Sequence, residues 1–305
     1  MKLAPIDPIL GTSLAFKSDP NPNKMNLGVG AYRDEQGKPY IFKTVKEAER
    51  RISNDSKINK EYLPIDGLKG LIVASQKVAF GFYEHMYNDL IQNQKLVTAQ
   101  TISGTGSLFI ALTFLKIHSP APVYISSPTW GNHKAIINHV GLPLAEYPYW
   151  DAKTKGLNFE GMMKTLSQAK PGSIILLHAC AHNPTGVDLS VEQWHILGDL
   201  IKARKLLPYF DSAYQGFASG DFKKDSVALE IFHSKGLNYM LSQSFAKNFG
   251  LYGERVGALH IICQNKTESA KVLSQLKLVI RRSYSNPPIH GALFCLLYTS
   301  PSPRD

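Results

Sequence analysis

The sequence predicts an α/β protein whose mostly parallel sheet carries helices on both faces. Hydrophobic residues make up 44% of the 305 residues and charged residues 19%, which is the balance of a globular protein with a buried core. Short apolar runs alternate with longer amphipathic segments, and this alternation is typical of parallel β/α units. At roughly 150 residues per domain, the length fits two domains or one large α/β domain.

Apolar runs mark the candidate strands, and the segments between them are candidate helices. Strands are expected at 97–102, 123–126, 142–147, 174–178, 207–210, 239–242 and 258–263. Helices are expected at 68–92, 106–116, 132–139, 159–168, 191–205, 226–234 and 266–281. The opening through about Tyr40 is rich in Pro, Gly and Asn, which predicts an irregular arm. The apolar run 292–297 predicts a buried helix that the prolines after it must end.

Charge and cysteine usage narrow the class of protein. Lys and Arg number 34 against 24 Asp and Glu, a net charge of +10, but they occur at most in pairs such as Arg50-Arg51. We therefore expect anionic small molecules rather than nucleic acid as partners. No apolar run reaches the ~20 residues that span a bilayer, so no membrane segment is expected. Three cysteines without zinc spacing indicate a reducing compartment, and they are Cys180, Cys263 and Cys295.

Polar clusters directly follow the expected strands. Because the carboxyl ends of parallel strands meet at one edge of a sheet, where ligands bind, we expect these clusters to form one site. The clusters lie at 103–106, 127–130, 178–186, 211–214 and 244–247.

Several residues in or near these clusters have the chemistry of a cofactor site. The glycine-rich turn 103–106 can bind a phosphate at a helix start, and Arg255 can add a bidentate charge. Lys247 ends an apolar strand, where desolvation makes an amine nucleophilic. Asp211 is a carboxylate at the edge of a core that needs a cation, and Trp130 offers a flat face. The alternatives are a plain helix-starting turn, a surface ion pair, a solvated lysine and core packing.

Two other chemistries are disfavoured. Ser244-x-x-Lys247 matches a serine acyl-enzyme signature, but its partner tripeptides Ser-Asp-Asn and Lys-Thr-Gly do not occur. His178, Cys180 and His182 alternate as ligands on one strand face would, yet the following Asn-Pro-Thr-Gly ends the strand. We therefore expect no metal site. A phosphate turn, a reactive lysine, a buried carboxylate and an aromatic face together fit pyridoxal 5'-phosphate.

At these residues the chain resembles the aspartate aminotransferases among the class I, fold-type I aminotransferases. The resemblance runs from residue 7 to a few residues beyond 288. Its motifs are Asn-Leu-Gly-Val-Gly-Ala-Tyr-Arg at 26–33, Glu-Tyr-Leu-Pro at 61–64, the whole of 178–186, Asp-Ser-Ala-Tyr-Gln-Gly at 211–216 and Lys-Asn-Phe-Gly-Leu-Tyr-Gly-Glu-Arg at 247–255. It implies the PLP-transferase fold and amino-group transfer between L-aspartate and 2-oxoglutarate.

The resemblance also implies roles for single residues. Lys247 forms the Schiff base and then moves a proton between the substrate and the cofactor. Asp211, supported by His178, keeps the pyridine nitrogen protonated, and Trp130 stacks on the ring.

The remaining implied contacts surround the ring and the substrate. Asn183 and Tyr214 bond the phenolic oxygen and lower the pKa of the Schiff base. Gly30 lines the substrate pocket together with Trp130 and Asn183, and Arg281 reaches across a homodimer to the distal carboxylate. The phosphate ligands are Gly104, Thr105, Ser244, Arg255 and, from the other subunit, Tyr62.

The chain also departs from the family pattern. We expect an arm and small-domain segment at 1–40, the large cofactor-binding domain at 41–294 and a non-family tail at 295–305 that resembles a translated sequencing adapter. Most of the small domain has no counterpart, nor has the arginine that clamps the substrate α-carboxylate. The chain as written is therefore expected to be nearly inactive.

Two alternatives to aspartate transamination and two compartments stay open. The alternatives are an aromatic or kynurenine aminotransferase and an inactive fragment that acts as a binding module. The resemblance and the basic charge favour the mitochondrial matrix, with the cytoplasm as the alternative.

Overall fold

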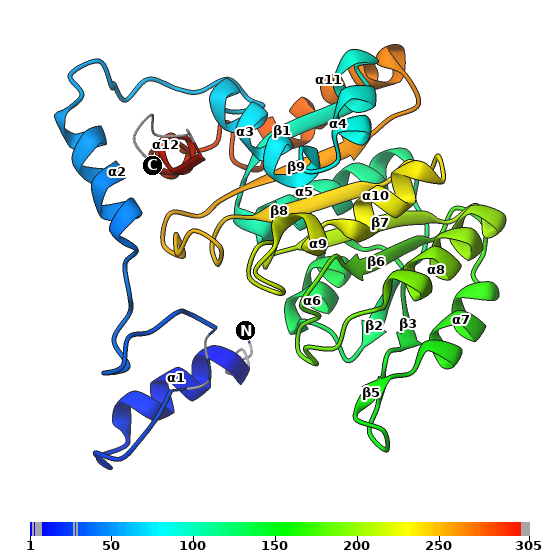
Figure 1. The fold of residues 1–305 in the computed structure, drawn as a ribbon, viewed down its shortest axis with the longest axis horizontal. Helices are drawn as coiled ribbons and strands as arrows, with labels where there is room; N and C mark the ends of the chain where they lie inside the picture. The colour runs from blue at the N-terminus through cyan, green and yellow to red at the C-terminus, as the bar shows by residue number, and fades with distance from the viewer. Residues whose placement is uncertain (2, 4–7, 27, 29, 300–305) are drawn as a thin grey trace.

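A seven-stranded sheet lies at the centre of the protein (Figure 1). The computed structural model describes residues 1, 3, 8–26, 28 and 30–299. Strand β9 pairs antiparallel with both of its neighbours, and the other pairs within this sheet are parallel. The prediction of a mostly parallel sheet is therefore confirmed. In spatial order the strands are β1 (Leu96–Ile102), β9 (Val256–Ile262), β8 (Met240–Ser244), β7 (Leu207–Ser212), β6 (Ile174–His178), β2 (Val123–Ser127) and β3 (Leu144–Pro148).

Helices cover both faces of this sheet. One face packs against α5 (Ser103–His118), α6 (Gly131–Val140) and α11 (Lys266–Ser283). The other packs against α3 (Lys69–Phe80), α4 (Glu84–Gln92), α7 (Phe159–Ser167), α8 (Val191–Arg204) and α10 (Val227–Ser234). Smaller elements are the hairpin β4 (Trp150–Asp151) and β5 (Gly156–Leu157) and the short α9 (Phe222–Asp225).

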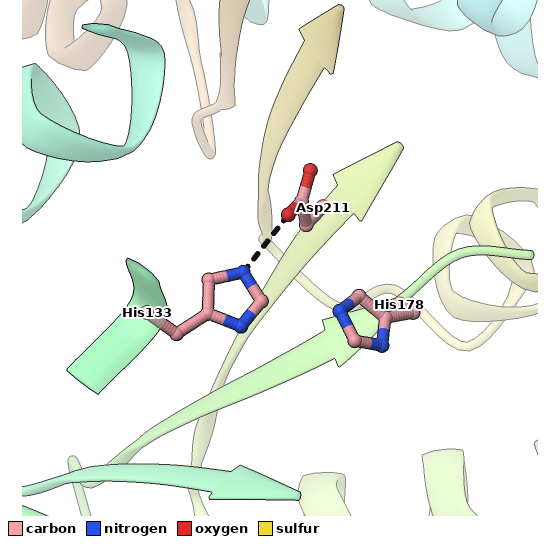
Figure 2. Close-up of side chains that lie close together, drawn as sticks. All are labelled: His133, His178 and Asp211. Carbon is pink, nitrogen blue, oxygen red and sulfur yellow. Dashed lines mark hydrogen bonds and ion pairs between the residues drawn. The ribbon is translucent and has the colours of Figure 1, made fainter. Parts of the chain in front are cut away.

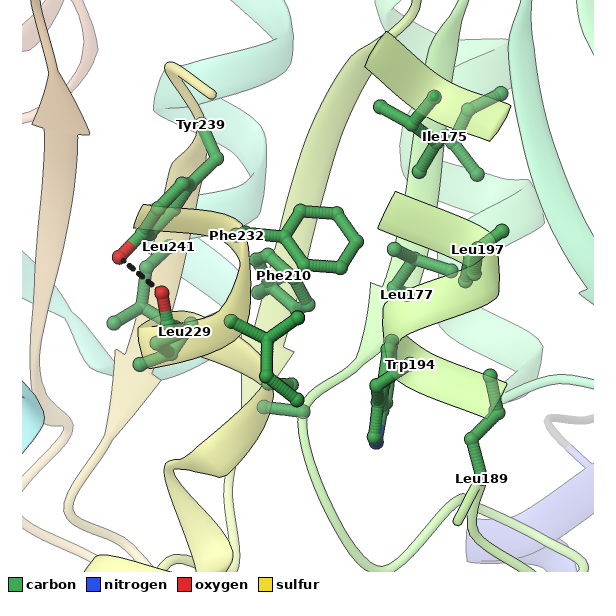
Figure 3. Packing of buried hydrophobic residues seen from close by; sticks show 14 of the residues in the cluster. Ile175, Leu177, Leu189, Trp194, Leu197, Phe210, Leu229, Phe232, Tyr239 and Leu241 are labelled. Carbon is green, nitrogen blue, oxygen red and sulfur yellow. Dashed lines mark hydrogen bonds between the residues drawn. The ribbon is translucent and has the colours of Figure 1, made fainter. Parts of the chain in front are cut away.

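Strand β6 is apolar from Ile174 to Leu177 because it buries both of its faces. Side chains alternate along β6, so Ile174 and Leu176 join one core while Ile175 and Leu177 join the other. Figure 3 shows the second core, where Phe210 of β7 meets Trp194 of α8 and Phe232 of α10. Continuous apolar runs are the sequence pattern that such two-sided burial requires.

The expected helix at 68–92 is wrong as one element, because the structure divides it. Helix α3 ends before Gly81, and α4 begins at Glu84. A Cβ on Gly81 would lie 2.5 Å from the carbonyl oxygen of Lys77, so only glycine fits at this helix end.

The expectation of an irregular N-terminal arm is wrong for its first part. Residues Pro8–Ser18 form α1, which lies apart from the sheet in Figure 1, and Pro8 occupies the first helical position, where its missing N–H costs nothing. Helix α2 (Lys43–Asn54) was not expected either. It buries Val45, Ala48 and Ile52 at helical spacing.

The predicted buried helix near 292–297 is confirmed as α12 (His290–Thr299). Its residues Ala292, Phe294 and Cys295 are buried in a cluster with α2, α3 and the loop after β8. Residues 300–305 lie outside the described residues, so the expectation for the tail 295–305 stays a prediction. None of the helices formed by the described residues is both long and apolar enough to cross a bilayer.

Candidate active site

A cavity of about 1010 Å³ opens at the edge of the sheet where the parallel strands end. Each of the five polar clusters predicted from the sequence contributes to its wall, and Gly28 and Gly30 of the N-terminal segment border it. Strand order explains the convergence, because β1, β2, β6, β7 and β8 all end at this edge and the antiparallel β9 begins here.

One end of the cavity has the form of an anion cradle. The N-terminus of α5 supplies Ser103, Gly104 and Thr105, and Ser244 of β8 lies opposite, with 3.1 Å between the hydroxyls of Ser103 and Ser244. A Cβ on Gly104 would lie 3.1 Å from the Cβ of Ser244, so a larger residue would crowd the space. Backbone N–H groups and the helix dipole favour a phosphate here.

Two residues of the cradle adopt a backbone conformation that side chains other than glycine rarely take. Ser103 has φ +59° and Arg255 has φ +50°. Such strain costs on the order of 1–3 kcal/mol per residue and persists at sites where function requires it. Arg255 also lines the cavity and brings the cationic charge that an anion needs.

The amine of Lys247 lies in the middle of the cavity wall. Nζ donates a hydrogen bond of 2.6 Å to the carbonyl oxygen of Gly30 and lies 5.0 Å from the ring centre of Tyr252. Burial, together with the positive charge of Arg255, lowers the pKa of this amine. A lowered pKa increases the neutral, nucleophilic fraction, so Lys247 is suited to attack an aldehyde.

The carboxylate of Asp211 is held by a histidine that the sequence analysis missed. His133 donates from Nε2 to Oδ2 of Asp211 over 2.9 Å (Figure 2). The hydroxyl of Thr129 lies 2.8 Å from Nδ1 on the other side of the ring. His133 is 1% exposed and lies in the first turn of α6. A histidine four residues after Thr129, just behind a polar cluster, was the available signal.

His178, the residue expected to support Asp211, lies close by. Its ring stacks on His133 with 5.2 Å between the centres, and Nδ1 has no hydrogen-bond partner among the described residues. Burial, with the neighbouring rings of His133 and His182, holds the pKa of His178 well below its ordinary value. The direct hydrogen bond to Asp211 thus comes from His133, and support of Asp211 by His178 stays a prediction.

His133, His178 and Asp211 also have the spacing of a metal site. One ligand atom from each lies within 4.8 Å of the others. A metal ion bound to them would break the hydrogen bond between His133 and Asp211. We therefore propose that the cluster serves to orient the carboxylate of Asp211.

The loop after β6 is fixed by His182. Its ring nitrogens lie 2.8 Å from Oγ of Ser126 and 2.7 Å from Oγ1 of Thr185, and the ring stacks on Tyr149. Burial lowers the pKa of His182 to about 4, so the ring stays neutral at neutral pH. The neighbouring Asn183 thereby lines the cavity from a rigid loop.

Two further groups complete the wall of the cavity. Tyr214 follows β7, and burial, with the charge of Asp211, raises the pKa of its hydroxyl, which therefore remains a hydrogen-bond donor. Trp130 packs edge-on against His133 with 5.2 Å between the ring centres and presents its indole to the cavity.

Two residues expected at the site lie outside the cavity that the described residues form. Tyr62 is 82% exposed. Arg281 is exposed at the end of α11 and bonds the hydroxyl of Ser285.

The residues present fit the pyridoxal phosphate that the sequence resemblance implies. The cradle offers N–H groups, hydroxyls and a guanidinium to a phosphate, while Asp211 offers a carboxylate to a basic ring nitrogen. Lys247 offers an amine to an aldehyde. The unpartnered Nδ1 of His178, buried at the cavity wall, also indicates that a polar group is accommodated here.

Comparison with known proteins agrees with the fit of the site to pyridoxal phosphate. Residues 22–303 match the family described as "Aminotransferase class I and II". The mitochondrial aspartate aminotransferase of Xenopus tropicalis is 50% identical, over 100% of this chain and 71% of its own length.

Solved structures of aminotransferases superpose on the chain. The aromatic-amino-acid aminotransferase of Burkholderia pseudomallei, covalently bound to pyridoxal phosphate, has a TM-score of 0.93 at 46% identity, over 98% of this chain and 74% of that one. The aspartate aminotransferase of Saccharomyces cerevisiae cytoplasm has a TM-score of 0.94 at 42% identity, over 99% of this chain and 74% of that one.

Proposed function

The chain belongs to the class I and II aminotransferase family, and from this premise we propose that it transfers the amino group of L-aspartate to 2-oxoglutarate with pyridoxal phosphate as cofactor. The products are oxaloacetate and L-glutamate. The observation that carries the proposal is the convergence of Lys247, Asp211 and the cradle around Gly104 on one cavity. The 50% identity to a relative named for aspartate supports the choice of substrate.

The chain's residues divide the work of binding between them. Gly104, Thr105, Ser244 and Arg255 hold the phosphate, and Trp130 covers the ring. The carboxylate of Asp211, oriented by His133, keeps a proton on the ring nitrogen. Asn183 and Tyr214 donate hydrogen bonds to the phenolic oxygen. When bound, the cofactor supplies an electron sink for the bond between the substrate α-carbon and its hydrogen.

Lys247 has two tasks in this proposal. Its Nζ would hold the cofactor in the resting protein, and the same amine, when free, would accept the proton from the substrate α-carbon and return it to the cofactor. The lowered pKa of Lys247 suits both tasks, because a neutral amine is needed for attack and for proton removal.

A direct assay tests the proposal. The protein, with a family-like C-terminal third in place of residues 295–305, is loaded with cofactor and supplied with aspartate and 2-oxoglutarate, and oxaloacetate is followed. Lys247→Ala is expected to abolish transfer. Lys266→Ala, at the start of α11 and not among the residues that line the cavity, is expected to leave it unchanged. Equal transfer by Lys247→Ala and by the unchanged protein would refute the assignment.

We further propose that the protein acts as a homodimer in which Tyr62 reaches the other subunit's phosphate and Arg281 the other subunit's substrate. Their exposure outside this chain's own cavity supports this arrangement. Arg281 then selects dicarboxylic substrates, because a guanidinium binds a carboxylate through two parallel hydrogen bonds.

A second candidate is transamination of aromatic amino acids. The 46% identity to the Burkholderia enzyme, whose structure superposes closely, favours it as the alternative. Relative kcat/KM for aspartate and phenylalanine distinguishes the two candidates.

For the compartment, we propose the mitochondrial matrix, with the cytoplasm as the alternative. The mitochondrial Xenopus relative and the net charge of +10 support the matrix, while the yeast structure comes from a cytoplasmic protein. Fractionation of cells, with the protein followed by antibody, tests this.

A further inference from the structure

The carboxylate of Asp225, which does not line the cavity, accepts hydrogen bonds from several backbone N–H groups. Asp225 is the last residue of α9 and is 5% exposed. Oδ2 accepts from the N–H of Gly216 at 2.8 Å and of Ala218 at 3.2 Å, and Oδ1 accepts from the N–H of Ser219 at 3.1 Å. A buried carboxylate needs such partners, and here they all come from one turn.

That turn carries Tyr214 into the cavity. The carbonyl of Tyr214 accepts from the N–H of Phe217 at 2.9 Å and of Ala218 at 3.2 Å, so Tyr214 is the first residue of the turn that Asp225 holds. At Gly216 the backbone has φ +87°, and a Cβ there would lie 2.6 Å from the ring of Phe222. The turn is thus tight, glycine-dependent and tied to α9.

The same turn also contacts the loop that carries Lys247. Gln215 is 3% exposed and donates to the carbonyl of Val78 at 2.7 Å, while its own carbonyl lies 3.4 Å from Nδ2 of Asn248. Asn248 follows Lys247 directly. The negative charge of Asp225 also reaches the cavity wall, since after burial it is the largest influence that raises the pKa of Cys180.

We propose that Asp225 is a positioning residue that sets the place of the Tyr214 hydroxyl, and so the ionisation of the bound cofactor. The inference rests on the role proposed above for Tyr214. A carboxylate accepts at both oxygens, whereas the amide of asparagine accepts at one and places a second donor against the turn's own N–H groups. Asp225→Asn therefore releases part of the turn without changing the volume of the side chain.

Asp221 provides a matched control from the same segment. Its carboxylate caps α9 by accepting from the N–H of Lys223 and Lys224, is exposed, and makes no described hydrogen bond to the turn 214–219. Asp221 contacts that turn only through its backbone, which bonds the hydroxyl of Ser219 at 3.2 and 3.3 Å and is unchanged by a side-chain substitution. Asp221→Asn removes a carboxylate four residues away but keeps an oxygen that accepts from the N–H groups of Lys223 and Lys224. A general loss of negative charge near the turn would affect both variants.

The first measurement needs no cofactor. Amide hydrogen exchange of Gly216, Ala218 and Ser219 is followed in the unloaded protein. Asp225→Asn is expected to accelerate exchange at these amides at least about tenfold, while Asp221→Asn leaves them unchanged. Unchanged exchange in Asp225→Asn would show that the carboxylate does not hold the turn, and would overturn the proposal.

The second measurement is the pH midpoint of the visible absorption change of the bound cofactor. Loss of a hydrogen bond to a charged oxygen in Tyr214→Phe should raise this midpoint by about 1–2 pH units. Asp225→Asn should raise it in the same direction and add nothing in the Tyr214→Phe background. A smaller rise is expected for Asp225→Glu, which keeps both acceptors and serves as the test if the asparagine variant does not fold.

The outcomes separate the two proposals. If the unchanged protein shows no lysine-bound cofactor absorption, the proposed function fails. If the unchanged protein shows it, but Asp225→Asn and Asp225→Glu leave the midpoint where it is, the inference about Asp225 fails alone. An additive shift in the double variant would also overturn it, because Asp225 would then act independently of Tyr214.

Discussion

At the scale of single residues, we propose that the pair His133 and Asp211 holds the ring nitrogen of the cofactor. We expect His133→Leu to weaken cofactor affinity by about 10–150-fold, because a hydrogen bond to a charged group contributes about 1.5–3 kcal/mol. Equilibrium dialysis with pyridoxal phosphate measures the change. His139→Leu, an exposed histidine on the same helix, is the control and should bind as before. Equal affinity in both variants would contradict the role of His133.

Arg281 gives the second prediction at this scale. In Arg281→Ala, made in the protein with a family-like C-terminal third in place of residues 295–305, kcat/KM for aspartate should fall about 10–150-fold, because a charge-assisted contact to the distal carboxylate is lost. Phenylalanine never used the contact and should lose far less. The neighbouring Arg282, also exposed near the end of α11, provides the control variant Arg282→Ala. An equal loss for both substrates would mean that Arg281 has a structural role.

The residues that line the cavity could be predicted from the sequence where they directly follow a strand. Lys247, Asp211 and the turn at Gly104 were found because apolar runs end there and a parallel sheet gathers such ends. His133 and Asp225 were not, since each acts through a neighbour on another element. The position of His133 four residues after Thr129 was the only signal for it, and Asp225 had none. The contributions of Tyr62 and Arg281 depend on a second chain and stay predictions.

At the scale of elements, apolar runs located the seven strands of the main sheet, with ends within two residues of the structure. Helix boundaries were less predictable. Gly81 divides α3 from α4 although the apolar periodicity continues through it. Helix α1 was hidden by the prolines around it, whereas α2 did carry the spacing of Val45, Ala48 and Ile52, which its many charged residues outweighed.

The packing of α12 gives a prediction for an element. Phe294 is 4% exposed in the cluster that joins α12 to α2 and α3, so Phe294→Ala should lower the free energy of unfolding by about 3–5 kcal/mol through the cavity that it leaves. Leu278→Ala on α11, where the side chain is 45% exposed, should change it by less than about 1 kcal/mol. Urea unfolding measures both. A small effect of Phe294→Ala would show that α12 is not part of the folded core.

At the scale of the whole molecule, buried histidines make stability depend on pH. Burial lowers the pKa of His260 to about 3 and of His182 to about 4. Both bind protons less readily in the folded than in the unfolded chain. Their contribution is complete above the ordinary pKa near 6.5 and is lost as the pH falls below it toward the folded values.

The free energy of unfolding should therefore fall between pH 7 and pH 5. In His260→Gln that fall should be smaller by about 2 kcal/mol, because one proton no longer binds to the unfolded chain alone. His118→Gln, at an exposed histidine, should leave the pH dependence unchanged. Urea titrations at the two pH values supply the comparison, and an identical fall in His260→Gln and the unchanged protein would contradict it.

At the centre of the proposed function is one covalent bond, between Lys247 and the cofactor. Pyridoxal phosphate is added to the protein, the complex is reduced with borohydride, and the peptide that carries the pyridoxyl group is identified by mass spectrometry. We expect modification of Lys247, and its loss in Lys247→Ala. Stoichiometric modification at another lysine, with Lys247 unmodified, would contradict the assignment of this cavity as the active site.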